Sequence, residues 1–241
     1  MEGLGPVQAE IVALMQRSSR NGRHPPKGSE VRRRGASPEK TAQTRQAIVD
    51  AALQEFLEKG FADTTVASVS KRAGVAKGLI YRYFETKEEL FSAVVQQEIV
   101  HAHIEVDESK REPGERVGAF LRRTLLVTVR NIDKKSRADI ARVVIAEGSK
   151  FPALVEIYRR DVIEPLTQKI KRLAASARKA GELTGDELIQ NPQILLAPIW
   201  AGIVINKFLD KANPVDVGAL FEAQLDLIFS PNGNSRLKPY K

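Results

Sequence analysis

Residues 47–91 read AIVDAALQEFLEKGFADTTVASVSKRAGVAKGLIYRYFETKEELF. Apolar side chains recur every three or four residues at the start of this stretch and stop at Gly60, which is typical of an amphipathic helix that ends at a glycine. A Ser-Pro-Glu sequence at residues 37–39 has the pattern of an N-cap followed by a first helical turn. The sequence therefore predicts a helix over residues 37–60 with one apolar stripe.

Two short helices are predicted after this one. Thr64 or Thr65 can cap a helix over residues 66–73, Gly74 closes that helix, and another follows over residues 77–84. Two short helices with a glycine in the turn between them form the layout of a helix-turn-helix, whose second helix lies in the DNA major groove. Ordinary helical hairpins share this layout, so the chemistry of the exposed face has to separate the two.

The two faces of these short helices differ in chemistry. Apolar side chains that can close a core lie at Val69, Ala73, Val75, Ile80 and Phe84, opposite Ile48, Ala52 and Phe56 of the preceding helix. The residues left pointing outward are Lys77, Gly78, Leu79, Tyr81 and Arg82. A face with cations, a glycine, a leucine and an aromatic ring suits a helix inserted into a groove better than a helix that faces only solvent.

The same stretch resembles the TetR family of bacterial transcriptional regulators. The matching features, in order, are Ala51-Ala52, Phe56, Gly60-Phe61, Thr64-Thr65, Val69, Ala73-Gly74-Val75, Gly78, Tyr81, Phe84, Lys87 and Leu90. Ser70 and Tyr83 depart from the residues that are usual in the family. The motif covers about a fifth of the chain, and the remaining predicted helices agree with the family in number and size.

The resemblance implies which residues contact DNA. Lys77, Gly78 and Leu79 are expected at the edge of the major groove, where a lysine can reach a guanine or a phosphate, a glycine lets the backbone approach, and a leucine can contact a thymine methyl group. Phosphate contacts are expected from Tyr81, Tyr83 and Lys87, the last together with the N-terminus of the helix it begins.

Some of these positions have alternative interpretations. Thr65 can donate to a phosphate as well as cap its helix, or it can only cap. Arg82 can contact DNA or lie on a solvated helix face. The rings of Tyr81 and Tyr83 can instead pack against the neighbouring helices.

Beyond residue 35 nearly all apolar patterns have a period near 3.6, so the sequence predicts an all-α fold of about nine helices. The further helices are expected over residues 86–105, 114–131, 134–148, 152–180, 192–211 and 215–229, with a loop at 181–191. We expect four parts: a flexible basic arm (1–36), a helix-turn-helix DNA-binding domain (37–86), a ligand-binding and dimerisation domain (87–229) and a tail (230–241).

For the larger domain the resemblance implies a ligand pocket and a homodimer formed through the last two helices, which are rich in apolar residues. Two-fold symmetry then requires a near-palindromic operator. The apolar helices before them suggest a small lipophilic effector, whose binding releases the DNA. The candidate ligand-binding residues are His103, Arg123, Arg142, Tyr158, Trp200 and Asn206.

Charge supports a polyanionic partner. The 241 residues contain 38 Lys and Arg against 30 Asp and Glu, a net charge of +8, and a cluster of cations lies between residues 17 and 34. This arm can reach DNA or stay solvated. The alternative function is therefore a nonspecific DNA-compacting or anionic-surface-binding protein, which needs charge but no sequence-reading helix.

Several other function classes are disfavoured. The chain has no Cys, no phosphate-binding loop, no nucleophile elbow and no dinucleotide fingerprint. A lone Glu98-x-x-His101 spacing does not make a di-iron site, which needs a second such pair and two further Glu. We therefore expect no enzyme, no metal and no cofactor. The apolar run at residues 194–205 is interrupted by Pro198 and Gly202, which predicts a buried helix without a membrane partner, and the absence of an export signal predicts a cytoplasmic protein.

Overall fold

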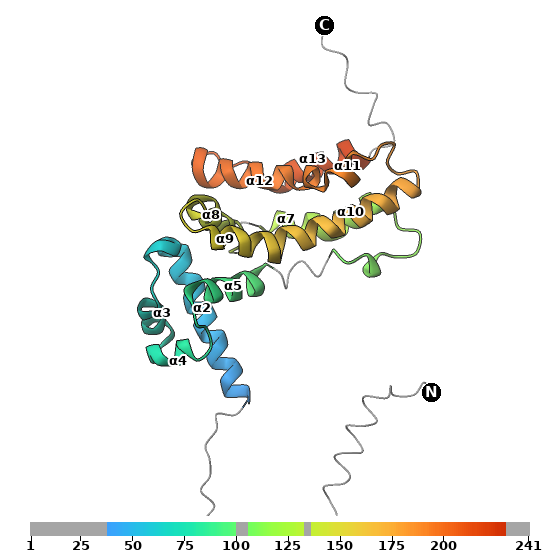
Figure 1. Ribbon diagram of the computed structural model, residues 1–241. Helices are drawn as coiled ribbons and strands as arrows, with labels where there is room; N and C mark the ends of the chain where they lie inside the picture. The colour runs from blue at the N-terminus through green and yellow to red at the C-terminus, as the bar shows by residue number, and fades with distance from the viewer. Residues whose placement is uncertain (1–37, 100–105, 133–135, 230–241) are drawn as a thin grey trace, which may run out of the picture. The chain divides into compact units, whose positions relative to one another are not determined.

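The computed structural model describes residues 38–99, 106–132 and 136–229, and all regular structure in these ranges is helical, as the sequence predicts. The predicted basic arm (1–36) and tail (230–241) lie outside the described residues, as does His103. The described part of the chain begins with α2 (Pro38–Asp63), α3 (Val66–Ala73), α4 (Lys77–Tyr81) and α5 (Lys87–Glu98) (Figure 1).

Local chemistry fixes the ends of α3. Thr65 is its N-cap, and Gly74 ends it in the left-handed conformation with φ 67°, which a residue without Cβ adopts without strain. The bounds of α3 agree with the prediction. Helix α4 is shorter than predicted: it ends at Tyr81, and the amides of Arg82 and Tyr83 donate to the carbonyls of Leu79 and Ile80, three residues earlier, as in a turn.

Helix α2 contains a kink where the sequence predicts its end. Gly60 has φ 79° and ψ 178°, which lies outside the helical region, and one further helical turn, residues 61–63, follows it. The first helical segment of α2 therefore ends at Gly60, and the chain changes direction there before the short helical turn that follows.

The remaining helices form longer runs than their individual bounds suggest. They are η2 (Glu108–Lys110), α6 (Val117–Leu121), η3 (Arg122–Leu126), α7 (Val127–Arg130), α8 (Arg137–Glu147), α9 (Pro152–Tyr158), η4 (Arg159–Ile163), α10 (Glu164–Lys179), α11 (Glu187–Gln190), η5 (Pro192–Leu196), α12 (Ala197–Val204), η6 (Ile205–Leu209) and α13 (Val217–Phe229). The predicted helices 114–131, 152–180 and 192–211 are each present as a continuous run that contains one π-helical turn, namely η3, η4 and η6. The short helix α11 lies in the segment predicted to be a loop.

One apolar core joins the predicted DNA-binding helices to the helices that follow. It contains buried residues of α2, α3, α4 and α5 together with residues of α8 and α9. At its centre the rings of Phe56, Phe61 and Phe91 lie within 5.8 Å of one another by ring centroid, and Phe151 lies 5.1 Å from Phe61. The core thus continues across the predicted domain boundary at residues 86 and 87.

A second core lies among α6, α7, α10, α12 and α13, with Phe120 and Phe221 fully buried in it. Helices α12 and α13 lie side by side (Figure 1). They approach closely because Gly202 has no side chain: a Cβ at this position would lie 2.5 Å from a methyl group of Val217.

The run Pro192–Leu209 corrects one prediction. Its mean hydropathy is 1.4, so by length and composition alone it could cross a membrane, a test that core helices of soluble proteins also pass. The sequence predicts that its apolar part is buried, but only 33% of the run is buried within the protein. The apolar side chains left exposed on this run and on α13 include Ile194, Phe208, Leu209, Leu220 and Leu227.

Candidate nucleic-acid interface and ligand pocket

Helix α4 presents one face that no other part of the described chain covers. Lys77, Gly78 and Arg82 are exposed, Leu79 is half-buried, and Tyr81 is 46% exposed, while Ile80 on the opposite face is fully buried. A Cβ built on Gly78 would meet no atom within 4 Å. The outward face that the sequence predicts for residues 77–82 is therefore present and accessible.

The neighbouring helix α3 begins with a reciprocal cap. The Thr65 hydroxyl oxygen accepts a hydrogen bond from the Ser68 amide at 3.0 Å, and the Ser68 hydroxyl oxygen accepts one from the Thr65 amide at 3.2 Å. These bonds show that Thr65 caps α3. The residue is also exposed, so it remains accessible to solvent.

Charged groups fasten α3 to α2 below this face. The Glu55 carboxylate, only 3% exposed, accepts a hydrogen bond from Lys59 at 2.6 Å and one from Arg72 at 2.7 Å. Arg72 also pairs with Glu58. Hydrogen bonds from Lys59, Ser68 and Arg72 lower the pKa of Glu55 to about 2. This network, which the sequence analysis did not identify, fixes the orientation of α3 and hence of α4.

Two predicted phosphate-binding residues have partners inside the protein. Tyr83 is partly buried against the first core. The Lys87 ammonium donates to the backbone carbonyls of Phe61 at 2.7 Å, Thr64 at 3.0 Å and Ala62 at 3.3 Å. It also lies 4.3 Å from the centroid of the Phe61 ring. The structure therefore assigns Lys87 to the turn after Gly60 rather than to an exposed cationic surface.

Helix α8 is bonded to the same turn. The Glu147 carboxylate accepts hydrogen bonds from the amides of Phe61 at 2.8 Å and Ala62 at 2.7 Å. Gly60 leaves room for it, because a Cβ there would lie 2.3 Å from a Glu147 oxygen. One turn earlier, Arg142 donates to the Leu57 carbonyl at 3.1 Å. The α8 helix and the end of α2 are thus joined by hydrogen bonds at two levels.

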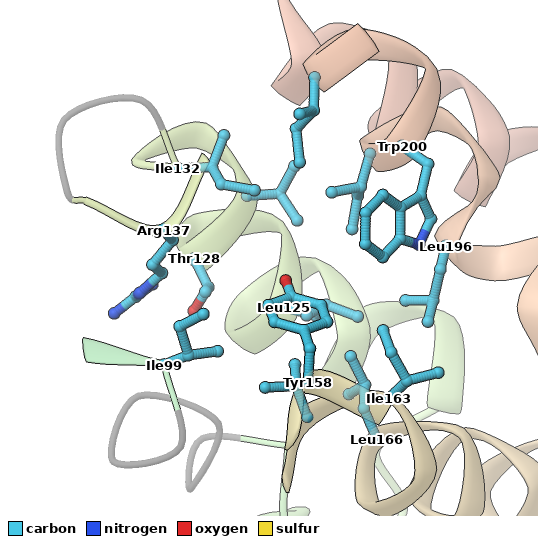
Figure 2. Close-up of a pocket in the computed structure, with 14 residues that line it drawn as sticks. Ile99, Leu125, Thr128, Ile132, Arg137, Tyr158, Ile163, Leu166, Leu196 and Trp200 are labelled. Carbon is cyan, nitrogen blue, oxygen red and sulfur yellow. The ribbon is translucent and has the colours of Figure 1, made fainter. Parts of the chain in front are cut away.

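The first residue of α8, Arg137, lines a cavity with an empty volume of about 580 Å³, part of it open to solvent (Figure 2). Most of its wall is apolar and includes Ile99, Leu125, Ile132, Leu166, Leu196 and Ile203. The π-helical turns η3 and η4 contribute Leu125, Val162 and Ile163, and such turns are frequent at functional sites.

Two of the residues predicted to bind a ligand, Tyr158 and Trp200, line this cavity. Their rings meet edge to face with centroids 5.9 Å apart. Tyr158 is 8% exposed, and its burial raises the pKa of the phenol above its usual value. Figure 2 shows its hydroxyl directed among the lining side chains.

Arg137 also lines the cavity and was not predicted. Its Nε donates to the Glu98 carbonyl at 3.1 Å, and partial burial lowers the pKa of the guanidinium from its usual value. Figure 2 shows this side chain at the edge of the cavity, beside Ile99. Nothing in the local sequence distinguishes Arg137 from other cations at the start of a helix.

Three other predicted ligand-binding residues have different partners. Arg123 pairs with Glu115 on the surface, with a 2.8 Å contact. Asn206 bonds both the amide and the carbonyl of Val215 and so closes the turn before α13. Arg142 bonds α2, as described above. None of the three lines the cavity, so the structure assigns them stabilising roles elsewhere.

Comparison with known proteins decides the family. Residues 48–94 match the model of bacterial regulatory proteins of the TetR family, and residues 119–190 match the C-terminal domain of AefR-like transcriptional repressors. The chain belongs to the TetR family. The first match covers α3, α4 and most of α2, and the second covers much of the cavity wall, so both halves of this TetR-family protein are recognised independently.

Two curated relatives match this chain, one over most of its length and one over about a fifth of it. The HTH-type transcriptional regulator AcrR of Shigella flexneri is 25% identical over 168 residues, which are 68% of this chain and 78% of AcrR. The HTH-type transcriptional regulator SrpR of Pseudomonas putida is 42% identical over 53 residues, 22% of this chain and 25% of SrpR.

The fold of this TetR-family protein is also that of solved structures. A SmeT–triclosan complex superposes with a TM-score of 0.67 at 19% identity and covers 83% of this chain and 99% of the SmeT chain. FadR of Bacillus subtilis in complex with stearoyl-CoA gives a TM-score of 0.59 at 18% identity, over 77% of this chain and 97% of FadR. At these identities the likeness establishes the fold.

Proposed function

We propose that this TetR-family protein is a ligand-responsive transcriptional repressor that acts in the cytoplasm. It binds a near-palindromic operator as a homodimer and leaves it when a small lipophilic molecule occupies the cavity. The observation that carries this proposal is that α8 contributes its first residue, Arg137, to the cavity wall and is hydrogen-bonded to the end of α2 through Glu147 and Arg142.

The exposed face of α4 is proposed to read the operator. Lys77, Gly78 and Leu79 approach base edges, and Tyr81 and Arg82 contact phosphates. Thr65 and Tyr83 add phosphate contacts through their hydroxyl groups. In support, the residues of this face are exposed or half-buried, and α3 is fastened beneath it by the Glu55–Arg72 ion pair.

The dimer is proposed to form through α12 and α13. Leu209 is 73% exposed and Leu227 is 66% exposed, although both belong to strongly apolar helices. Exposed apolar surface of this kind favours burial against a second copy. A dimer would place the two α4 helices in successive major grooves, about 34–36 Å apart.

Ligand and operator are proposed to oppose each other through α8. A molecule that moves the cavity wall moves α8, and α8 can carry the end of α2 with it because their contacts are charge-assisted hydrogen bonds. Coupling between binding sites is reciprocal, so operator DNA would weaken ligand binding by the same factor.

The test is selection of bound sequences from a random DNA pool at about 150 mM salt, where purely electrostatic binding is already weakened. We expect one near-palindrome. Leu79→Ala should then cost about 1–3 kcal/mol on that site and little on scrambled DNA, while Lys71→Ala, which changes an exposed cation of α3, serves as the matched control. If the selected sequences were unrelated and their binding were lost on addition of salt, the result would instead support a protein that binds DNA or anionic surfaces without sequence preference.

A further inference from the structure

We propose that the ligand of this cavity is an organic acid, a mainly apolar molecule whose anionic group pairs with Arg137 and whose oxygen accepts a hydrogen bond from Tyr158. The inference rests on the proposed function and narrows its effector from lipophilic molecules in general to lipophilic anions.

The first observation is the Tyr158 hydroxyl. The side chain is more than nine-tenths buried, and within the described residues its hydroxyl has no hydrogen-bond partner. Leaving a buried polar group unpaired costs free energy, so native proteins rarely do so without a reason. The hydroxyl points into a cavity (Figure 2), where a bound molecule can supply the missing acceptor.

The second observation is the Arg137 guanidinium. Its Nε is held by the Glu98 carbonyl, whereas its two terminal nitrogens have no acceptor among the residues that the structure describes. Partial burial lowers the pKa of this guanidinium, and the nearby Glu98 carboxylate offsets only part of that effect. An anion at this edge would offset that cost, and a guanidinium can bind a carboxylate through two parallel hydrogen bonds.

The third observation is that the other walls provide no further charge. Apart from Arg137 and Tyr158, the lining residues are apolar except Thr128 and Trp200. The Thr128 hydroxyl is within 3.4 Å of the Thr124 carbonyl of its own helix. A cavity with one cationic edge and apolar walls fits a molecule with one anionic end and an apolar body.

Trp200 provides the measurement. It is the single tryptophan of the chain and lines the cavity, so its fluorescence reports occupancy directly. The probes are decanoate, decanol and methyl decanoate, which share an apolar chain and differ in charge. They are titrated into the full-length protein without DNA at neutral pH.

We expect decanoate to bind about tenfold more tightly than decanol or its methyl ester. Arg137→Gln should remove this preference by weakening decanoate alone, Arg137→Lys should retain part of it, and Tyr158→Phe should weaken all probes that carry an oxygen acceptor. Arg172→Gln, a change of an exposed arginine outside the cavity, should leave all three affinities unchanged. Circular dichroism confirms that each variant is folded.

Equal affinities for decanoate and decanol, or no change in Trp200 emission with any probe, would overturn the inference. So would an Arg137→Gln variant that loses all probes equally while folded. Operator selection is measured separately, so these results overturn the acid preference and leave the DNA-binding function standing, whereas failure of the selection overturns the proposed function itself.

Discussion

The Glu147 carboxylate accepts a hydrogen bond from the backbone amide of Phe61, a residue 86 positions earlier, at 2.8 Å. A second bond from the Ala62 amide makes the contact bidentate. Because the accepting oxygens belong to α8 and the donating amides to the end of α2, this contact ties the cavity-bordering helix to the helices beneath the proposed DNA-reading face.

Glu147→Gln replaces one of the two acceptor oxygens with an amide group that cannot accept. We expect the free energy of unfolding to fall by about 1–3 kcal/mol, because one amide at the end of α2 loses its partner. Urea unfolding measures this. Glu156→Gln removes an exposed carboxylate paired with Arg159 and should cost less than about 1 kcal/mol. Equal losses of unfolding free energy in the two variants would contradict a stabilising contact between Glu147 and the end of α2.

Gly78→Ala should separate DNA binding from folding. A Cβ at this helical position meets no protein atom, so thermal stability should stay the same or rise by up to about 1 kcal/mol. Operator affinity, measured by fluorescence anisotropy, should fall because the methyl group holds the backbone away from the groove. Gly74→Ala is the control: it has equal space but φ 67°, so it should lose about 1–2 kcal/mol of stability. Unchanged operator affinity in Gly78→Ala would exclude close approach at this residue.

Lys87→Ala distinguishes the sequence interpretation from the structural one. If Lys87 binds phosphate, the variant weakens binding to all DNA sequences alike. Its bonds to the carbonyls of Phe61, Ala62 and Thr64 instead predict a stability loss of about 1–3 kcal/mol. Lys77→Ala should show the opposite pattern, with unchanged stability and weakened operator binding. Urea unfolding and operator titration on the same samples give the comparison.

Stability should depend on acid pH through Glu55. Its pKa is about 2 in the folded protein against a usual value of 4.5, so the unfolded chain binds this proton more tightly. The stabilisation is complete above pH 4.5 and is lost as the pH falls towards 2. Glu55→Gln should therefore be less stable at neutral pH and lose less stability than the wild type over this interval. If the urea midpoints of the wild type and of Glu55→Gln depended on pH in the same way, Glu55 would make no contribution to the pH dependence of stability.

Leu227→Glu tests the dimer surface. The side chain is 66% exposed in the single chain, so a charge there costs the protomer little but would be buried in the proposed interface. We expect sedimentation to show monomers and the near-palindromic operator to be bound more weakly. Val155→Glu introduces the same charge at a 46% exposed residue of α9 and should remain dimeric. A dimeric Leu227→Glu variant would require a different interface.

The sequence predicted the features that depend on neighbouring residues. Thr65 and Gly74 delimit α3 by local hydrogen bonding and by backbone conformation, so its bounds could be predicted, and the exposed face of α4 followed from helical periodicity. The end of α4 at Tyr81 was not predicted, although the bonds of the turn that follows it are local.

The contacts that could not be predicted join residues far apart in the sequence. No local pattern indicates that Lys87 bonds to carbonyls 23–26 residues earlier or that Glu147 bonds to amides 85 and 86 residues earlier. Arg137 belongs to the cavity because α8 packs beside it. Polarity alone indicates Arg123 and Asn206 as ligand-binding residues, but their side chains bond to Glu115 and to the backbone of Val215.

The apolar core that runs from α2 to α9 also limits how this repressor fold can be recombined. A chimaera that kept residues 38–86 and took the rest from another regulator would replace Phe91 and Phe151, two of the rings packed around Phe61. It would replace Glu147 as well. Exchange of DNA specificity between regulators should therefore succeed more often when only the surface residues of α4 are transplanted than when the first three helices are moved as a block.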